Sequence, residues 1–519
     1  MRLSSSDDIY GAPRRGHDRG SLQHKRASVE RPANRYLAGK AHQVIRLAIA
    51  IGLTGAAGCT RSTAPRPIAI THASIIDTET GVIHPDNTVI VTGNRITYAG
   101  PASSAPAPSG AEVIDGRGKY LIPGLWDMHV HGFVYEFSDF AGPLFVANGV
   151  TGVRDMGYYV DTTLRWRADI AAGREVGPRI IVGARVDGAV NKVGYIAHVT
   201  TQEDGVRAVD TMARKKDGAR RADFIKVYSY IPKDAYYGIV REAKRLGVPF
   251  AGHVPYSVTM IEAADSGQRS VEHEDDLMRA CSSRDSVLRA RAADTTTFSR
   301  QVEEIREQAR LLATSYDPQR CRRVIAALVR NRTWFTPTLI VYKPYNHAFD
   351  SSDTHPELSR YVPGIVQGGW MRRVRALSPK DSLTVRNFYS FARTNELHKA
   401  GVRMLAGSDT PQPFVYPGFS LHDELALLVE AGLTPLEALR TATHNPAEFL
   451  GALDSLGAVA TGKVADLVLL DANPLTDIRN TRRISAVIAN GRLFDRAALN
   501  RLLAKVQAAV RSAPAETSP

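Results

Sequence analysis

The middle of this chain alternates short apolar runs with helical stretches, and this alternation constrains the fold more than any other feature. Eight apolar β-type runs follow one another, at residues 122–130, 149–154, 179–186, 224–228, 249–253, 270–273, 334–341 and 402–406. Helical stretches between them stop at glycines, as residues 233–246 do before Gly247. Short, regular spacing of strand and helix implies parallel strands. Eight such units predict a closed α/β barrel of the (β/α)8 TIM type.

Shorter β runs on both sides of the middle predict a small β-sandwich assembled from the N- and C-terminal segments. These runs extend from Pro67 to about Gly124 and return at 465–470 and 484–493. The expected division is a leader at 1–59, the sandwich at 60–125 and 456–498, the barrel at 126–455 and a C-terminal tail at 499–519. Insertions at about 274–333 and 342–401 leave from strand C-terminal ends, where such barrels carry their active sites, so both are lid candidates.

The net charge of +13 does not by itself indicate a nucleic-acid partner. Ten Lys and Arg against four Asp and Glu fall within the first sixty residues, and the other basic residues are mixed with acidic ones. Without a clustered basic stripe or a binding motif, we expect no nucleic-acid binding. Hydrophobic residues make up 44% of the 519, as in proteins that fold in water.

A short apolar run at 44–58 ends in small residues directly before Cys59. It is too short to span a bilayer but fits the apolar region of a secretion signal. Small residues before a cysteine resemble a bacterial lipobox, so we expect an exported cell-envelope protein with a lipid anchor at Cys59. The alternative is a stray apolar stretch in a cytoplasmic protein. The other two cysteines, Cys281 and Cys321, form either one disulfide or two unrelated thiols.

Two histidines stand two residues apart at the end of the first barrel strand, at His129 and His131. Alternate side chains share one strand face, so both imidazoles can reach the same ion, although a purely structural pair is the alternative. Ligand-type residues also end four later strands, namely Lys226, His253, His273 and Asp409. Singly, each fits a structural role in packing, solvent contact or capping. Together they point into one barrel mouth, where unpartnered polar groups would be costly.

These six positions resemble the amidohydrolase superfamily, whose pattern places His-x-His on strand 1, Lys on strand 4, His on strands 5 and 6, and Asp on strand 8. Flanking phrases match as well, at 222–227, 252–254, 271–273, 406–410, 442–447 and 462–468. The resemblance extends over about 67–498 and looks nearest to the branch with imidazolonepropionase and prolidase-like peptidases. Imidazolonepropionase looks different at the lysine and uses one metal. Lys226 therefore favours the two-metal peptidase side.

The resemblance implies two divalent metal ions, zinc first, held by the six residues, with Lys226 as a bridging carbamate. Such a pair lowers the pKa of a bridging water towards 7 and polarises a carbonyl. Asp409 would pass the proton to the departing nitrogen. We expect hydrolysis of an amide or peptide C–N bond in a small substrate, with prolidase-like cleavage of dipeptides first. The alternatives are a cyclic amide, lactone or phosphoester substrate and a non-catalytic binding barrel; self-association into a homo-oligomer is left open.

Substrate contacts are expected from Tyr228, on the strand face of Lys226, and from Tyr195 and His198, after the third strand. Packing at the barrel rim is the alternative for each. A substrate carboxylate can pair with a cation of the insertions, where the candidates are Arg322, Arg323, Lys343 and Arg372, although charged insertions are usually solvated surface.

Two other polar groups are assigned structural roles. Arg154 and Asp155, which follow the second strand, are expected in an internal ion pair. Ser420, His422 and Asp423 fit the capped start of the last barrel helix better than a hydrolase triad, because no nucleophile elbow precedes Ser420.

Overall fold

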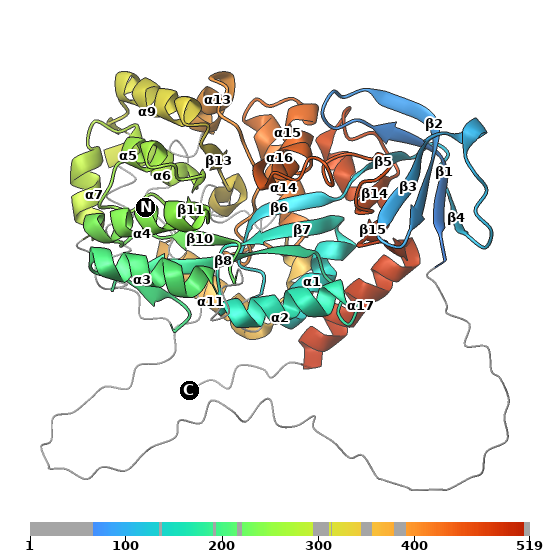
Figure 1. The fold of residues 1–519 in the computed structure, drawn as a ribbon, viewed down its shortest axis with the longest axis horizontal. Helices are drawn as coiled ribbons and strands as arrows, with labels where there is room; N and C mark the ends of the chain where they lie inside the picture. The colour runs from blue at the N-terminus through green and yellow to red at the C-terminus, as the bar shows by residue number, and fades with distance from the viewer. Residues whose placement is uncertain are drawn as a thin grey trace, which may run out of the picture. The chain divides into compact units, whose positions relative to one another are not determined.

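The computed structural model describes residues 66–133, 138–189, 194–214, 221–293, 311–312, 314–343, 355–377 and 391–512. Seven parallel strands form the barrel sheet in the order β13-β12-β11-β10-β8-β7-β6 (Figure 1). Their bounds are β6 Leu125–Val130, β7 Val150–Asp155, β8 Arg179–Asp187, β10 Phe224–Val227, β11 Phe250–Gly252, β12 Ser270–Glu272 and β13 Trp334–Thr336. A two-residue strand, β9 Ala197–His198, pairs with β8 at the edge of this sheet. The expected parallel barrel is confirmed.

The eighth wall of the barrel is an irregular segment rather than the regular strand expected at 402–406. The Phe335 amide donates to the Arg403 carbonyl at 2.9 Å, and on the other side the Met128 amide donates to the Ala406 carbonyl at 2.9 Å. Gly407 runs so close to β6 that an added Cβ would lie 2.7 Å from the His129 Cβ. The segment therefore closes the barrel through single bridges. Strand β13 is likewise shorter than the expected 334–341, and a 3-10 turn, η4 Leu339–Tyr342, follows it.

Helices follow most barrel strands and begin and end with ordinary capping signals. The helix α4 Lys233–Leu246 ends at Gly247, which has a left-handed φ of 63°. Glycine adopts this conformation easily because it has no Cβ. Capping boxes start α3 Gln202–Ala213 and α5 Met260–Asp265. The remaining helices along the barrel are α1 Ser138–Ala147, α2 Val160–Ala171, α14 Phe419–Glu430, α15 Pro435–Thr441 and α16 His444–Leu450.

The two insertions contribute further helices at the end of the barrel strands. The first carries α6 Glu274–Ala280, α7 Asp285–Ala293 and α9 Pro318–Arg330, and the second carries η6 Pro356–Tyr361, α11 Gly364–Leu377 and α13 Ala392–Lys399. A disulfide joins Cys281, at the end of α6, to Cys321 in α9, so of the two expected states of these cysteines the structure has the paired one.

A second sheet unites both ends of the described chain, as expected. Its order is β16-β15-β14-β5-β1-β2-β3, with β4 beside β1. The strands are β1 Ile68–Ile76, β2 Ile83–Thr92, β3 Arg95–Pro101, β4 Glu112–Asp115, β5 Tyr120–Pro123, β14 Leu467–Leu470, β15 Ile484–Ala489 and β16 Arg492–Asp495, with short 3-10 turns at η2 Ala102–Ser104 and η7 Ile478–Arg482. Antiparallel pairing of β5 with β14 joins the two segments in one continuous sheet over an apolar core.

Hydrogen bonds fix this sheet to the barrel. The Gly124 amide donates to the Asp466 carbonyl at 2.8 Å, and Arg179 Nε lies 2.5 Å from Asp466 Oδ2. The stretch expected as a C-terminal tail is helical as far as Ser512, in α17 Arg496–Ser512, which packs against α1.

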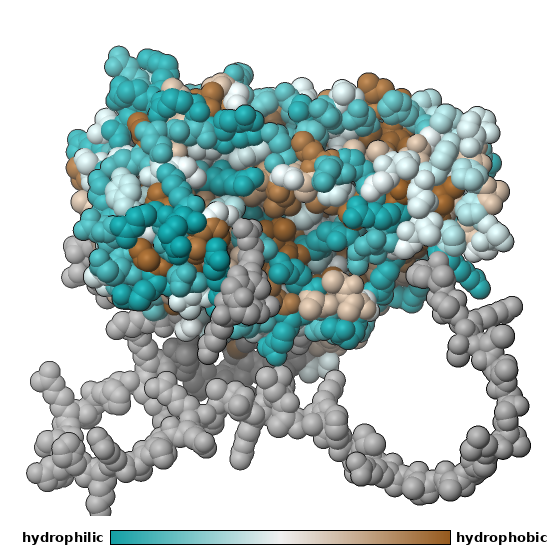
Figure 2. All heavy atoms as spheres, in the orientation of Figure 1, coloured by the Kyte–Doolittle hydropathy of each residue, from teal (hydrophilic) through white to brown (hydrophobic). Residues whose placement is uncertain are grey.

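Hydrophilic side chains cover most of the face drawn in Figure 2, and the apolar ones lie between them in small groups. Among the helices that the structure describes, none is long and apolar enough to cross a membrane. The apolar run at 44–58 and Cys59 lie outside the described residues.

Candidate metal centre

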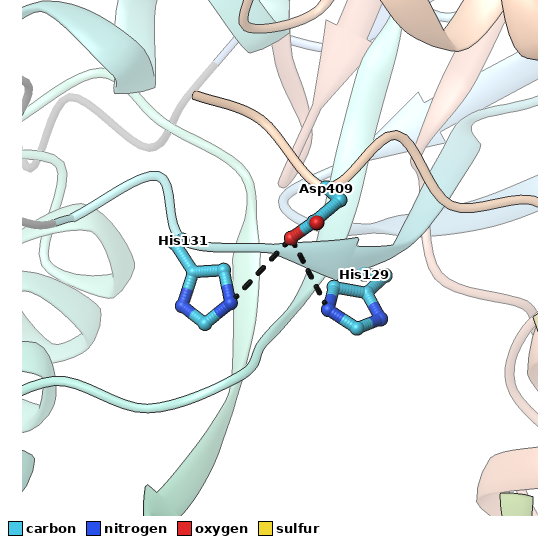
Figure 3. Close-up of side chains that lie close together, drawn as sticks. All are labelled: His129, His131 and Asp409. Atoms are coloured by element: carbon cyan, nitrogen blue, oxygen red, sulfur yellow. Dashed lines mark ion pairs between the residues drawn. The ribbon is translucent and has the colours of Figure 1, made fainter. Parts of the chain in front are cut away.

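His129, His131 and Asp409 meet where β6 ends (Figure 3). His129 Nε2 lies 3.3 Å and His131 Nε2 lies 3.5 Å from Asp409 Oδ1. Backbone bonds bring the partners together, because the Asp409 amide donates to the His129 carbonyl at 2.7 Å and the His131 amide donates to the Thr410 carbonyl at 2.7 Å. The irregular closing segment thus places the carboxylate against the histidine pair.

The other two histidines extend this group into a continuous array. The ring centroids of His129 and His273 are 4.7 Å apart, and those of His273 and His253 are 4.6 Å apart. Asp409 and His273 both have a positive φ, 56° and 69°, a conformation that is uncommon for residues with a side chain.

Lys226 is fully buried on β10, next to β11. Its side chain passes Gly252 so closely that a Cβ there would lie 2.8 Å from the Lys226 Cδ. The same Cβ would lie 2.2 Å from the Val227 carbonyl oxygen, and Gly252 has a φ of 135°, so the backbone accounts for the glycine before His253.

Buried polar atoms without hydrogen-bond partners show that these residues fit a metal ion. Such atoms are His129 Nε2, Lys226 Nζ and Asp409 Oδ1. Leaving buried donors and acceptors unpaired is costly, so several of them in one place indicate a missing charged ligand. Imidazole nitrogens with a carboxylate are a donor set suited to zinc and similar divalent ions.

A buried charge network orients His129. Its Nδ1 donates to Glu272 Oε2 at 2.9 Å, which leaves Nε2 directed at Asp409. Arg154 NH2 donates to both Glu272 oxygens at 2.9 Å, and Arg154 NH1 donates to Ser270 Oγ at 2.8 Å. The internal ion pair expected for Arg154 therefore exists, but its partner is Glu272 rather than Asp155.

Two more contacts hold the outer side of the site. His273 Nδ1 lies 2.8 Å from Thr338 Oγ1, so its other nitrogen is left for the site. Asp127 accepts hydrogen bonds from the Ser408 amide and from Ser408 Oγ, at 2.9 and 2.6 Å, and thereby ties the loop before Asp409 to β6. Contacts of this kind usually set the orientation and basicity of metal ligands.

Burial sets the protonation of the cluster. Burial, followed by the charge of Lys226, lowers the pKa of His129 and His131 well below the ordinary value, and that of His273 to about 3. These imidazoles are therefore neutral and can donate a lone pair. Burial also lowers the pKa of Lys226 to about 7 and raises that of Asp409 to about 7.

Of the three expected substrate residues, Tyr228 lies in the site. Its ring centroid is 4.3 Å from that of His253, and the Arg185 guanidinium lies 3.8 Å from the same tyrosine ring. Tyr195 packs with Tyr158 at 4.9 Å and belongs to an aromatic group beyond Arg185. His198 is exposed, with Nδ1 3.3 Å from the Gly188 carbonyl oxygen.

The cations expected to read a substrate carboxylate are not among the residues that contact the His-His-Asp group in the described structure. Arg322, Arg323 and Arg372 are exposed, and the charge of Lys343 acts on Asp423, where it lowers the pKa of that carboxyl. A neighbouring residue was missed instead, because Arg373 is buried and its charge lowers the pKa of Asp409. Its position on α11 is the signal that could have found it, since Arg373 comes three residues after Trp370 and so shares the helix face of that apolar side chain.

The Ser420 group is structural. His422 Nδ1 lies 2.9 Å from Thr481 Oγ1 and its Nε2 lies 3.1 Å from the Asn148 carbonyl, so the ring is used within the core. The expected capped start is corrected: the helix begins after Gly418 without a side-chain cap, and Ser420 Oγ accepts from the Tyr416 amide at 2.8 Å.

The structure is thus a parallel α/β barrel with a buried His-His-Asp group at its mouth, a donor set that could hold a metal ion. The amidohydrolase family model matches residues 387–494, and the resemblance to the amidohydrolase superfamily is confirmed. Ochratoxinase from Aspergillus niger is 38% identical over 101 residues, 18% of this chain and 20% of that protein. Imidazolonepropionase from Methylobacterium sp. (strain 4-46) is 28% identical over 159 residues, 29% of this chain and 39% of that protein.

The chain thus spans between 11% and 39% of the lengths of the curated relatives it matches. Among solved structures, a bottromycin amidohydrolase has 24% identity and a TM-score of 0.64, with 86% of this chain and 91% of that one covered. A Xaa-Pro dipeptidase with bound methionine has 19% identity and a TM-score of 0.59, with 83% and 100% covered. These structural likenesses concern the fold.

Proposed function

We propose that this protein is a metal-dependent hydrolase that cleaves an amide or peptide C–N bond in a small substrate, with dipeptides first. The observation that carries the proposal is the buried group of His129, His131 and Asp409, together with the unpartnered buried atoms of His129, Lys226 and Asp409. Support for the substrate class comes from fold neighbours that include a Xaa-Pro dipeptidase and a prolidase complexed with N-methylphosphonate-L-proline.

In this proposal the four histidines, Asp409 and Lys226 hold two divalent ions, zinc in the first place. Bound divalent ions lower the pKa of water and polarise a carbonyl. Lys226 would take part as a carbamate. Its pKa of about 7 supports this role, because a neutral amine is the form that reacts with carbon dioxide and the product is an anion suited to metal.

Asp409 would move the proton. Burial raises the pKa of this carboxyl to about 7, so near neutral pH it can both accept a proton and release it. Its Oδ1 has no hydrogen-bond partner and faces both imidazoles of the β6 pair. Asp409 can therefore take the proton of the attacking water and give it to the departing nitrogen. Tyr228, whose ring packs beside that of His253, would orient the substrate carbonyl.

The metal test uses purified full-length protein. We expect about two equivalents of zinc or a similar ion by elemental analysis. Asp409→Asn should keep most of the metal and lose turnover, because the amide cannot carry the proton. Full activity in this variant, or in protein stripped of metal, contradicts the mechanism.

The substrate test compares a panel of dipeptides with cyclic amides, lactones and phosphotriesters. The similarity to imidazolonepropionase makes a cyclic amide the second candidate. Cleavage of dipeptides supports the first choice. If a cyclic amide, a lactone or a phosphotriester is hydrolysed and no dipeptide is cleaved, the proposed substrate class is wrong. The proposed metal site is unaffected by that result.

A further inference from the structure

The helix α11 in the second insertion turns one face towards the metal centre. Val366, Trp370 and Arg373 are buried and are spaced four and three residues apart, so they share one side of the helix. Arg372, the next residue back, is exposed on another side.

Trp370 fixes this helix to the loop that carries Asp409. Its Nε1 donates to the Pro411 carbonyl at 3.0 Å, and its ring packs 5.4 Å from Tyr416 and 5.8 Å from Phe414. An apolar cluster of Leu358, Val362, Val366, Trp370 and Tyr416 surrounds this contact. The face of α11 is therefore held at a fixed place beside the site.

Arg373 lies on this face without an ion-pair partner among the described residues. Only 5% of the residue is exposed, and its Nε and NH1 are buried without a hydrogen-bond partner. Its charge acts on Asp409, yet among the described residues no carboxylate lies within 4 Å of the guanidinium. A buried cation is costly unless it is paired.

We propose that Arg373 binds an anionic group of the substrate, a carboxylate in the first place, and so selects free acids over their amides. This inference rests on the proposed function, because the metal centre supplies the other end of the substrate site. A planar guanidinium with spare donors is suited to a carboxylate, and helix α11 holds it preorganised. The assignment gives the site its substrate class: small amides with a free acid near the scissile bond.

The activity experiment measures kcat/KM for L-alanyl-L-proline and L-alanyl-L-prolinamide. Wild type should prefer the acid by roughly tenfold to a hundredfold, the range that hydrogen bonds to a charged group give. Arg373→Gln should abolish the preference, because its rate on the acid should fall far more than its rate on the amide. Arg372→Gln is the matched control and should keep the full preference.

A binding experiment separates this inference from the proposed activity. Calorimetric titration of the metal-loaded protein with N-acetyl-L-proline and N-acetyl-L-prolinamide needs no turnover, so it decides the role of Arg373 even if no dipeptide is cleaved. Wild type should bind the acid more tightly and Arg373→Gln should not, at equal metal content. Equal or undetectable binding of both probes by wild type, or an acid preference kept in Arg373→Gln, overturns the inference. If Arg373→Gln does not fold, Arg373→Lys is measured instead. The inference then requires that Arg373→Lys lose most of the preference for the acid over the amide.

Discussion

His129 is positioned by a carboxylate from another strand. Glu272 accepts from its Nδ1 and is itself held by Arg154, and all three side chains are buried. The arrangement fixes the imidazole tautomer and directs Nε2 into the site. Such a network is costly to break, because removing one charge leaves its partner buried and unpaired.

We expect Glu272→Gln to weaken metal binding by roughly tenfold to a hundredfold, because the amide keeps the shape but loses the charge that orients His129. Chelator competition measures this change in affinity. Glu242→Gln is the control, since Glu242 also has little exposure but pairs with Arg245 on α4, away from the histidines. Unchanged metal affinity in Glu272→Gln would show that the carboxylate plays no part in the site.

The ends of the second insertion are tied to the barrel helices by ion pairs. His355 precedes η6, with Nδ1 3.2 Å from Glu357 Oε1 and Nε2 3.7 Å from Asp423 Oδ2 on α14. The Asp423 carboxylate, and then Glu357, raise the pKa of the half-buried His355 above its ordinary value. The insertion that carries Arg373 is therefore held in part by a pH-dependent contact.

We expect His355→Gln to destabilise the protein in acid more than in base. Because the pKa of His355 is raised in the folded protein, its protonated form stabilises the fold. This contribution is complete below the unfolded pKa of about 6.5 and is lost as pH rises through the folded pKa. The difference in Tm between wild type and variant should be larger at about pH 5.5 than at about pH 8.5, with a free-energy change of about 1 kcal/mol or less. In an Asp423→Asn background the pH dependence should shrink, and a difference that grows with pH would contradict the assignment.

At the scale of the whole molecule, both chain ends contribute to one sheet, and that sheet is bonded to the barrel through Asp466. The disulfide between Cys281 and Cys321 adds a covalent link within the barrel insertion. Disulfides persist in oxidising compartments. We propose on this ground, and on the apolar run before Cys59, that the protein is exported and carries a lipid at Cys59.

The mature protein in its native host should begin at a lipidated Cys59 and fractionate with membranes. Mass spectrometry of the N-terminal peptide measures this directly, and Cys59→Ser should move the protein to the soluble fraction. An intact leader on the native protein would rule out export by this signal.

The sequence by itself determined the barrel, the joining of both ends in one β domain and the six residues proposed as ligands. It could do so because strand periodicity and residue type at strand ends are local properties, and parallel strands bring their ends to one face. The tertiary structure alone decided the rest. Arg154 pairs with Glu272 rather than with its neighbour Asp155, isolated bridges replace the closing strand, and the charge of Arg373 acts on Asp409. Each of these depends on which side of an element faces a distant segment, and only packing fixes that.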